Sequence, residues 1–322
     1  MRIAIGVITR RRPQGLRRLL ESLGALDLSG PPRSGNHRHL DGSRRIEAEV
    51  LLVENDEPPG MGEPPACRLP LRHAFETTLG IPFARNRVIE IALAEEAPGG
   101  FDAIAFVDDD ETVDPSWLRE LVATLESSGA DAVTGPALAA FEGGEPPRWA
   151  VRSGAFDCLD FPTGTLRPTA FTHNVLVATK ALRETGLRFD ERLAMTGGSD
   201  TQLFARLALA GRRIVWCREA ICREWTPTSR LTIAWARQRA YRIGATDAWI
   251  ALDLGTTSRA GLLWLAMRYL IRGPFRLVAD LPRRGLAGAA VACLQDFAKA
   301  RGIVAGTLGF FRHEEYRTHH GR

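Results

Sequence analysis

The chain has 322 residues, of which 45% are hydrophobic and 25% are charged, and its formal charge is +4. These proportions exclude a disordered or fibrous protein, and no apolar run reaches the roughly 18 residues of a membrane-spanning helix. The five cysteines form no CxxC pair, so the sequence predicts neither a disulfide framework nor a structural zinc site. Arginines follow the first apolar run at once, which is unlike a signal peptide, and we expect a cytoplasmic protein.

The first half of the chain alternates short β-branched runs with helical patterns. We expect strands at residues 3–8, 50–53, 103–107 and 132–134, and helices at 13–26 and 82–94. A further helix is predicted to begin at Asp114-Pro115, with Asp114 as its N-cap. This order predicts a mostly parallel sheet with helices on both faces. Residues 29–45, rich in Gly, Pro, Ser and Arg, predict a loop or a disordered insertion.

The second half has a different pattern. Residues 141–168 are rich in glycine, proline and aromatic residues, which indicates a surface loop that contacts the substrate. Strands are expected at 175–178 and 213–217, with a helix at 201–210 between them. Everything beyond Thr232 is predicted to be helical. Three tryptophans of this half are expected in the core, namely Trp216, Trp225 and Trp235.

Polar clusters follow three of the predicted strands directly. They are Thr9-Arg10-Arg11-Arg12, Glu54-Asn55-Asp56 and Asp108-Asp109-Asp110. In an open parallel sheet ligands bind outside the carboxyl ends of the strands, so these clusters are expected to share one ligand-binding edge. The chain contains neither GxGxxG nor GxxxxGK[ST], and the usual dinucleotide and P-loop sites are therefore not indicated.

The three consecutive aspartates allow two interpretations. Adjacent carboxylates repel one another, and a divalent cation would remove that repulsion. Asp108 and Asp110 could thus hold Mg²⁺ or Mn²⁺ against a diphosphate, with one carboxylate on the metal and another near a ribose. The alternative is a solvated acidic turn ahead of the next helix.

Four further residues each carry a functional and a structural interpretation. Arg85, at a predicted helix N-terminus, is either a phosphate clamp or a surface arginine. Asp200, after two glycines, is either a general base or a helix N-cap. His173 is either an acceptor-site residue or a strand-edge histidine. Trp149 stacks either on a sugar ring or on Phe156.

The C-terminal region is basic. Residues 259–312 contain eight Arg and one Lys against two Asp, a net charge of 9 − 2 = +7. From Leu262 to Arg272, apolar residues and arginines alternate at helical spacing. Such a segment is typical of an interfacial helix on an anionic membrane, and it could equally pack on the core or on a second subunit.

The order of these motifs resembles that of family 2 glycosyltransferases with the GT-A fold. The matching segments are IGVITRRRP (5–13), VLLVEND (50–56), GIPFARNR (80–87), AFVDDDETVDP (105–115), THNVLV (172–177) and LRFDERLAMTGGSDTQLFARL (187–207). Within that family the chain is most similar to the succinoglycan-type glucosyltransferases of exopolysaccharide biosynthesis. The resemblance implies a GT-A domain over residues 1–250. Its residues 1–135 would bind the nucleotide-sugar and 136–250 would supply the acceptor site and base, followed by a helical extension at 251–322.

The resemblance also assigns roles to individual residues. It implies Asp200 as the catalytic base and a DxD motif in which Asp108 and Asp110 bind Mn²⁺ or Mg²⁺. Donor-binding residues are expected at Thr9, Arg11, Glu54, Asn55, Arg85, Asp108 and Asp109. Acceptor contacts are expected at Trp149, His173, Asn174, Gly198 and Ser199. Two positions depart from the family pattern, since Ser199 replaces an acidic residue and Glu54-Asn55 replaces an Asp-led pair.

The implied activity is inverting, metal-dependent transfer of a sugar from a nucleotide-sugar, most simply a UDP-sugar, to a hydroxyl of a glycan or lipid-linked acceptor. The QxxRW motif of processive synthases is absent, which favours a single addition. One alternative is a sugar-phosphate nucleotidyltransferase, which would need a glycine-rich loop after the first strand. The other is a catalytically silent protein of the same fold. We expect no nucleic-acid partner, and an enzyme that is cytoplasmic or peripheral on the inner face of the membrane.

Overall fold

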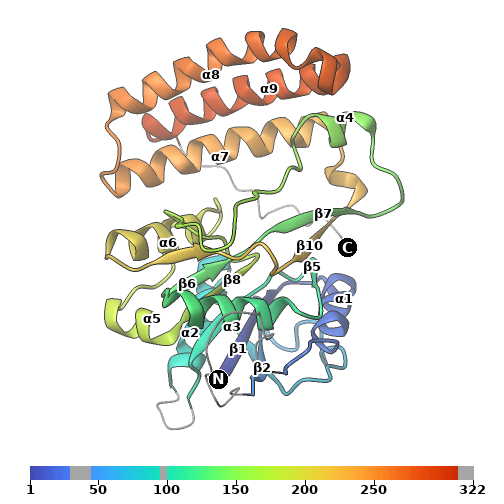
Figure 1. The fold of residues 1–322 in the computed structure, drawn as a ribbon, viewed down its shortest axis with the longest axis vertical. Helices are drawn as coiled ribbons and strands as arrows, with labels where there is room; N and C mark the ends of the chain where they lie inside the picture. Colours follow the sequence, from blue (N-terminus) through green and yellow to red (C-terminus); the bar gives the residue numbers. More distant parts are fainter. Residues whose placement is uncertain (30–44, 95–99, 311–322) are drawn as a thin grey trace.

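The computed structural model describes residues 1–29, 45–94 and 100–310, so nearly all of the loop predicted at 29–45 lies outside the described residues. A seven-stranded sheet with the order β3-β2-β1-β4-β8-β6-β9 forms the centre (Figure 1). Its strands are β1 (Arg2–Thr9), β2 (Glu47–Glu54), β3 (Leu71–Phe75), β4 (Ala103–Phe106), β6 (Ala132–Thr134), β8 (Val175–Ala178) and β9 (Ile214–Trp216). Only β8 runs antiparallel to its neighbours, which confirms a mostly parallel sheet.

Helices cover both faces of this sheet, as predicted. Helices α1 (Pro13–Leu23) and α3 (Trp117–Ser128) pack on one face against Ile3, Ile5 and Val7. Helices α2 (Ile81–Ala94), α5 (Thr179–Thr185) and α6 (Ser199–Leu209) pack on the other face, against Ala4, Leu51 and Val53. Successive strand residues point to opposite faces, so both cores are filled from the same apolar runs.

A smaller sheet lies beyond the carboxyl ends of the central strands. It has the order β5-β10-β7, with β5 (Glu111–Val113), β10 (Cys222–Thr226) and β7 (Ala137–Phe141). The segment after β7, predicted as a loop, contains the short helix α4 (Arg148–Arg152). Of the two 3₁₀ turns, η2 (Thr228–Arg230) follows β10 in this region, whereas η1 (Glu191–Leu193) lies against α2. The small sheet brings β10 against the turn that follows β4.

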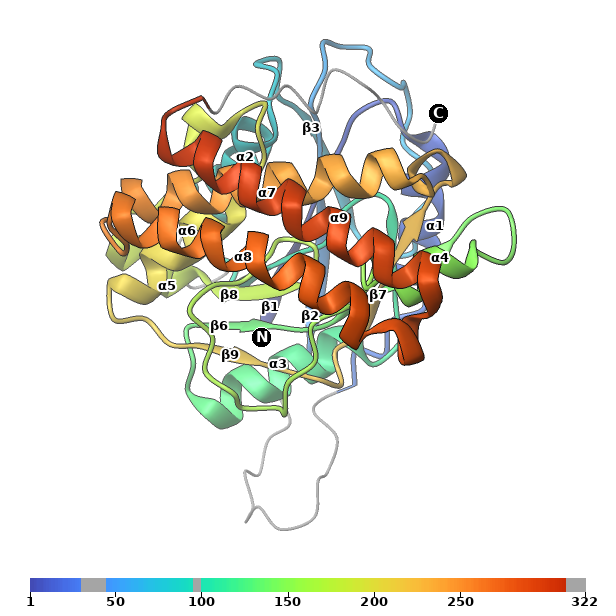
Figure 2. The same ribbon diagram turned by 90° about the horizontal axis from the view of Figure 1, so that it is seen from above.

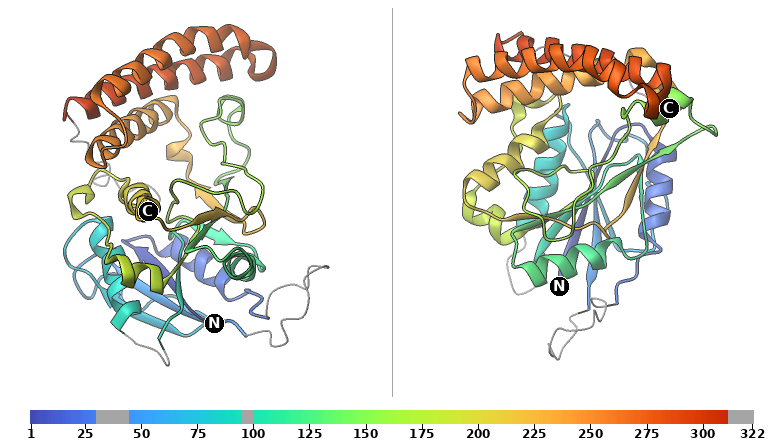
Figure 3. Two further views of the ribbon diagram at one scale, coloured as in Figure 1. Left: turned by 60° about the vertical axis from the view of Figure 1, so that its left-hand side comes forward. Right: turned by 45° about the horizontal axis from the view of Figure 1, so that its top comes forward.

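Three long helices close the described part of the chain, as predicted beyond Thr232. They are α7 (Ile233–Asp253), α8 (Arg259–Ala279) and α9 (Leu281–Thr307), and they lie side by side in a layer over the edge at which the parallel strands of the central sheet end (Figures 1 and 2). Helix α9 packs between α7 and α8, and α8 faces away from the central sheet (Figure 3). No helix of the described residues is long and apolar enough to cross a membrane.

Some details of the predictions are wrong. Helix α3 begins at Trp117 with Ser116 in the N-cap position, because the Asp114 carboxylate forms an ion pair with Arg223 of β10. Helix α1 ends at Leu23 and not at residue 26. Strands β3, β5, β7 and β10 were not predicted, since each has only three to five residues and no clear alternation. Trp216 is buried as predicted, whereas Trp225 and Trp235 are half-buried.

Candidate active site

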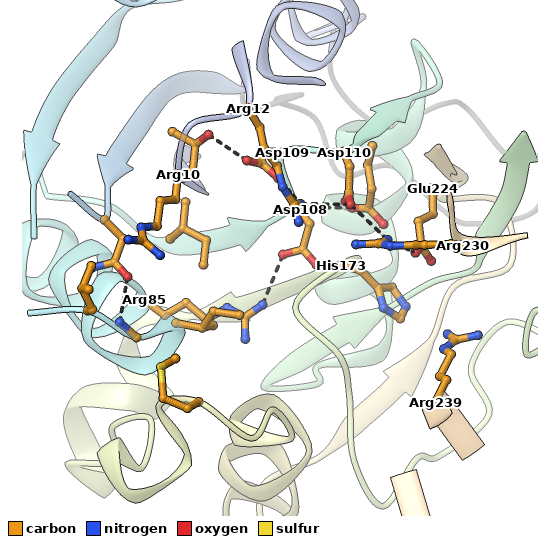
Figure 4. Close-up of a pocket in the computed structure, with 18 of the residues that line it drawn as sticks. Arg10, Arg12, Arg85, Asp108, Asp109, Asp110, His173, Glu224, Arg230 and Arg239 are labelled. Carbon is orange, nitrogen blue, oxygen red and sulfur yellow. Dashed lines mark hydrogen bonds and ion pairs between the residues drawn. The ribbon is translucent and has the colours of Figure 1, made fainter. Parts of the chain in front are cut away.

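A cavity of about 300 Å³ opens where β1, β2 and β4 end, at the edge that the polar clusters predicted (Figure 4). Its lining combines residues that are far apart in sequence. Thr9 comes from β1, Asn55 from the end of β2, Arg85 from α2 and Asp108 to Glu111 from the turn after β4. Trp235 and two arginines of α7 close the cavity from above, so Trp235 is a cavity residue and was wrongly expected in the core.

The aspartate turn is held by cations on both sides. Arg85 donates to Asp108 at 3.2 Å, and Arg12 lies 3.1 Å from Asp109 and 3.2 Å from Asp110. Arg230 of η2 approaches Asp110 at 3.5 Å from the opposite side (Figure 4). The solvated acidic turn is therefore wrong: Asp109 is buried, and all three carboxylates are paired with arginines.

Burial governs the ionisation of two acids in this turn. It raises the pKa of Asp109 to about 6, although Arg12 and the Thr9 hydroxyl, which donates to Asp109 at 2.7 Å, act in the opposite direction. Burial also raises the pKa of Glu111 well above its ordinary range, and Asp108 adds to this effect by charge repulsion. One oxygen of Glu111 accepts the Asp108 backbone N–H at 2.9 Å. Glu111 thus shapes the turn and does not face a ligand as an ordinary carboxylate.

Arginines dominate the charge of the cavity. Six line it, namely Arg10, Arg12, Arg85, Arg230, Arg239 and Arg242. They outnumber the five lining acids: Asp108, Asp109, Asp110, Glu111 and Glu224. Guanidinium groups bind phosphate oxygens through two parallel hydrogen bonds, so a diphosphate fits this lining. Arg85 was singled out from the sequence, and Arg10 and Arg12 belong to a polar cluster that was expected at this edge. The other three, from η2 and α7, become neighbours of the cluster only through the fold.

The carboxylates suit a divalent cation that also binds its substrate. Among the described residues no group of three or more His, Cys, Asp or Glu side chains is arranged to hold a metal. Asp108 and Asp110 both face the cavity, however, and Mg²⁺ is commonly bound by one or two carboxylates together with substrate phosphates and water. Asp108 and Asp110 therefore fit a cation that binds together with a diphosphate. Without that cation, their carboxylate oxygens are paired with arginines.

The remaining predicted donor residues fall into two groups. Thr9 and Asn55 line the cavity, and the Asn55 side chain holds the loop before α2 by bonds to Glu76, Thr78 and Gly80 at 2.8–2.9 Å. Glu54 is fully buried and lines no described cavity; it accepts the Met61 backbone N–H at 2.7 Å. Arg11 points to Asp56 and away from the cavity, while its neighbours Arg10 and Arg12 line it.

A second, larger cavity of about 1000 Å³ adjoins the first. It lies between α6, α7 and the segment around Phe156, and the side chain of Lys299 reaches it from α9. Several residues line both cavities, among them Arg85, Asp108, His173 and Glu224. A molecule in the first cavity and one in the second would therefore meet at these residues.

Asp200 lies in the wall of the larger cavity, near the start of α6. It is not the N-cap of that helix, because Gly198 holds the N-cap position. One Asp200 oxygen accepts the Thr201 backbone N–H at 2.8 Å, and the other lies 3.4 Å from Thr172 N. Gly198 has φ +84°, and a Cβ there would overlap the methyl group of Thr246, so glycine is needed for α7 to pack this closely.

The predicted acceptor residues have different surroundings. His173 lines both cavities and stacks on Phe171, with 5.4 Å between ring centroids. Gly198 and Ser199 line the larger cavity. Asn174 is fully buried and lines neither cavity, and Trp149 likewise lines neither.

The larger cavity also contains groups that sequence reasoning missed. Phe156 lines it and stacks on Trp235 with an interplanar angle of 3°, so its main partner is Trp235 and not Trp149. The Thr246 hydroxyl and the Trp216 indole N–H are buried in its wall without a hydrogen-bond partner among the described residues. Buried polar groups normally find a partner, and a ligand rich in hydroxyls would supply one.

The chain is similar to several known proteins. The succinoglycan biosynthesis protein ExoM of Rhizobium meliloti (strain 1021) is 29% identical over 334 residues, which cover 98% of this chain and 96% of that protein. The mannosyltransferase PcManGT from Pyrobaculum calidifontis, in complex with GDP-Man and Mn²⁺, matches with a TM-score of 0.52 at 14% identity, over 95% of this chain and 75% of that one. S. aureus TarS 1-349 with UDP-GlcNAc matches at a TM-score of 0.49 and 16% identity, covering 94% and 90% of the two chains.

The likeness to PcManGT concerns the fold, which is GT-A as predicted. The family model described as "Glycosyl transferase family group 2" matches residues 103–293, which is more than half of the chain. These residues include the aspartate turn, Asp200 and all of α7. The chain therefore belongs to glycosyl transferase family group 2.

Proposed function

We propose that this glycosyltransferase moves a sugar from a nucleotide-sugar, most simply a UDP-sugar, to a hydroxyl of a glycan or lipid-linked saccharide, with inversion and one addition per encounter. The observation that carries the proposal is the pair of adjoining cavities. The smaller one gathers arginines around Asp108–Asp110, the larger one contains Asp200, and both share Arg85 and His173. A donor in the first and an acceptor in the second would place the sugar between them.

The first half of the chain would bind the donor. Arg85 and Arg12 would pair with the diphosphate, and their fixed positive charge would stabilise the charge that builds up as the diphosphate leaves. Thr9, Asn55 and Asp109 are proposed to line the nucleoside side of this site. Residues 1–135 would thus form the donor-binding half of the domain, and 136–250 the acceptor half.

Asp108 and Asp110 are proposed to hold Mn²⁺ or Mg²⁺ when the donor is bound. Such a cation would add Lewis-acid charge stabilisation of the leaving diphosphate. Arg12 and Arg230, which contact Asp110 at 3.2 and 3.5 Å, would then be released toward the phosphate oxygens.

Asp200 is proposed as the general base. Its carboxylate is oriented by the Thr201 N–H, and it would take the proton from the acceptor hydroxyl as that oxygen attacks the anomeric carbon. One displacement inverts the configuration, and this chemistry requires no second nucleophile. His173, Gly198 and Ser199 line the route between this carboxylate and the donor cavity, and we propose them as acceptor contacts.

The biological setting is proposed from the relatives. ExoM is named for succinoglycan biosynthesis, which supports a role for this chain in cell-surface polysaccharide assembly. PcManGT binds GDP-Man with Mn²⁺, which supports a nucleotide-sugar donor and a divalent cation here. The proposed place of work is the cytoplasm, at the inner face of the membrane where lipid-linked acceptors lie.

The test is a panel of UDP- and GDP-sugars incubated with and without Mn²⁺ or Mg²⁺, following release of nucleoside diphosphate. We expect metal-dependent release from one donor. In Asp110→Ala that release should fall about 100-fold or more, because a positioned charge at the leaving group is lost. The control is Asp160→Ala, which removes a surface carboxylate paired with Arg218 outside both cavities.

Three results would contradict the proposal. Equal release by Asp110→Ala and Asp160→Ala would exclude the aspartate turn from the reaction. Absence of any donor binding in calorimetry would favour a silent protein of the same fold. Release of pyrophosphate from a nucleoside triphosphate and a sugar phosphate would instead indicate the nucleotidyltransferase alternative.

A further inference from the structure

The outer face of α8 carries a continuous apolar stripe. Trp264, Met267, Ile271, Phe275 and Val278 follow one another at intervals of three or four residues, which places them on one side of the helix. All five are exposed, with Phe275 at 73% and Val278 at 74%. Leu281 and Leu286, in the first turns of α9, extend the exposed apolar surface. Exposed apolar surface on this scale marks an interaction site.

The opposite side of α8 is already occupied. Leu262, Ala266 and Gly273 are its buried residues, and the helix packs on α9, with Gly273 next to Cys293. The stripe therefore faces away from the catalytic domain, on the outermost layer of the molecule (Figures 1 and 3). Nothing in the described chain covers it.

The layer formed by α8 and α9 carries more positive than negative side chains. Between residues 254 and 310 the only acids are Asp280 and Asp296. Asp296 is buried and accepts from Arg272 at 3.0 Å and Arg276 at 3.3 Å, while Asp280 pairs with Arg276 at 3.2 Å and Arg284 at 3.0 Å. Both acids are thus neutralised inside the hairpin.

Four exposed arginines of the same layer form no ion pair with any described residue, and they are Arg259, Arg268, Arg283 and Arg301. Arg268 lies within the apolar stripe, and Arg283 lies at the α8–α9 junction. The surface is therefore apolar and cationic at once, and its partly exposed carboxylate, Asp280, is paired with Arg276 and Arg284.

We propose that the outer face of α8, with the α8–α9 junction, lies flat on an anionic lipid bilayer. The stripe would enter the headgroup boundary, and Arg268 and Arg283 would pair with lipid phosphates. A second copy fits less well, because two such faces would oppose arginine to arginine with no unpaired carboxylate of the described residues between them. The inference is independent of the proposed reaction and would bring the enzyme to a surface where lipid-linked acceptors reside.

The test is flotation of the full-length protein with vesicles of neutral phosphatidylcholine and with vesicles that also contain phosphatidylglycerol. We expect binding that rises with the phosphatidylglycerol content and weakens in high salt. Ile271→Ser combined with Phe275→Ser should lower the partition coefficient at least about tenfold, because the inserted area is lost. The matched control is Leu166→Ser combined with Leu138→Ser, two exposed apolar residues outside this layer.

Two further variants separate charge from apolar insertion. Arg268→Gln and Arg283→Gln should each weaken binding to anionic vesicles about fivefold, from about 1 kcal/mol per arginine near the surface. Arg218→Gln, at an exposed arginine of the catalytic domain, should have no effect. Trp264 fluorescence should be quenched by brominated lipids, and that quenching should disappear in Trp264→Phe.

The results of the vesicle-binding experiments can be told apart from the results of the activity assay. Asp200→Asn should bind vesicles as the wild type does, whatever its activity, and melting curves establish that each variant is folded. Absence of binding to anionic vesicles, or equal binding by the Ile271/Phe275 variant, would overturn the inference. So would a wild-type dimer in analytical ultracentrifugation that dissociates in the Phe275→Ser variant, since the face would then join two copies.

Discussion

Asn174 and His173 are neighbours in sequence with opposite surroundings. Asn174 donates to the carbonyl oxygens of Pro136 and Ala220 at 2.8 and 2.7 Å, and it accepts the Trp117 indole N–H at 2.8 Å. His173 lines both cavities. Asn174 therefore holds three segments together, and His173 faces the two cavities that are proposed to bind the substrates.

We predict that Asn174→Ala lowers the free energy of unfolding by about 3 kcal/mol or more, because the change strands buried partners in addition to losing their bonds. His173→Ala should change it by less than about 1 kcal/mol and should lower the transfer rate about tenfold. Urea unfolding and an activity assay on both variants check this. An Asn174→Ala protein of normal stability with a raised acceptor KM would instead make Asn174 an acceptor contact.

Sequence reasoning located the site residues only in part. Asp108, Asp110, Arg85 and Asp200 follow strands or begin helices, and such positions at the carboxyl edge of a parallel sheet can be recognised in the sequence. Arg11 was expected to bind the donor, but its φ of +54° turns it toward Asp56. Which member of an arginine run enters a cavity depends on local backbone angles, and these have no sequence signal of their own.

At the scale of elements, the packing of α7 on α9 depends on glycine. A Cβ on Gly302 would overlap the Tyr241 carbonyl oxygen, and one on Gly306 would overlap that of Ala245. A Cβ on Gly244 of α7 would likewise overlap the Lys299 carbonyl oxygen. The two helices thus meet backbone to backbone, and α7 in turn roofs both cavities.

Gly302→Ala should force these helices apart and lower the free energy of unfolding by more than about 2 kcal/mol, because neither backbone can yield. The matched change is Gly261→Ala on α8, where the nearest atom is the methyl group of Thr257 at 3.0 Å, at a half-buried position. The free energy of unfolding of this variant should stay within about 1 kcal/mol of that of the wild type. Thermal unfolding and hydrogen exchange of α9 amides measure both, and equal effects would show that the close approach is not required.

The helices and long strands could be predicted because their apolar periodicity is strong. The sequence of α9 predicts a helix, but it does not predict that this helix packs on α7. Small residues on one face of a helix allow close packing against many different helices. The short strands β5, β7 and β10 depend on pairing with one another, and Asp114 was diverted from its expected cap by Arg223 of β10. Tertiary pairing of this kind overrides local preference.

At the scale of the whole molecule, the chain brings three parts to one place. The first half supplies the aspartate turn and three of the six cavity arginines, the second half supplies Asp200 and Arg230, and α7 covers both cavities with two further arginines. The division proposed after residue 250 falls within α7, so the helical layer is continuous with the domain that it covers. The GT-A architecture could be inferred from motif order alone, whereas the shared wall of the cavities required the structure.

Asp200 is the residue proposed to take the proton from the acceptor hydroxyl. Asp247 of α7 is a second carboxylate in the larger cavity, and it lies 3.6 Å from Lys299, so it provides a matched comparison. Both side chains can be changed to asparagine with little change in shape.

The most direct measurement is therefore the sugar-transfer rate of Asp200→Asn beside that of Asp247→Asn, at saturating donor and acceptor. We predict a loss of about 100- to 10,000-fold for Asp200→Asn, the usual worth of general base catalysis, with donor affinity unchanged. Asp247→Asn should stay within about fivefold of the wild type, because Lys299 and not the acceptor proton is its partner. Near-normal transfer by Asp200→Asn, or the larger loss in Asp247→Asn, would contradict the account.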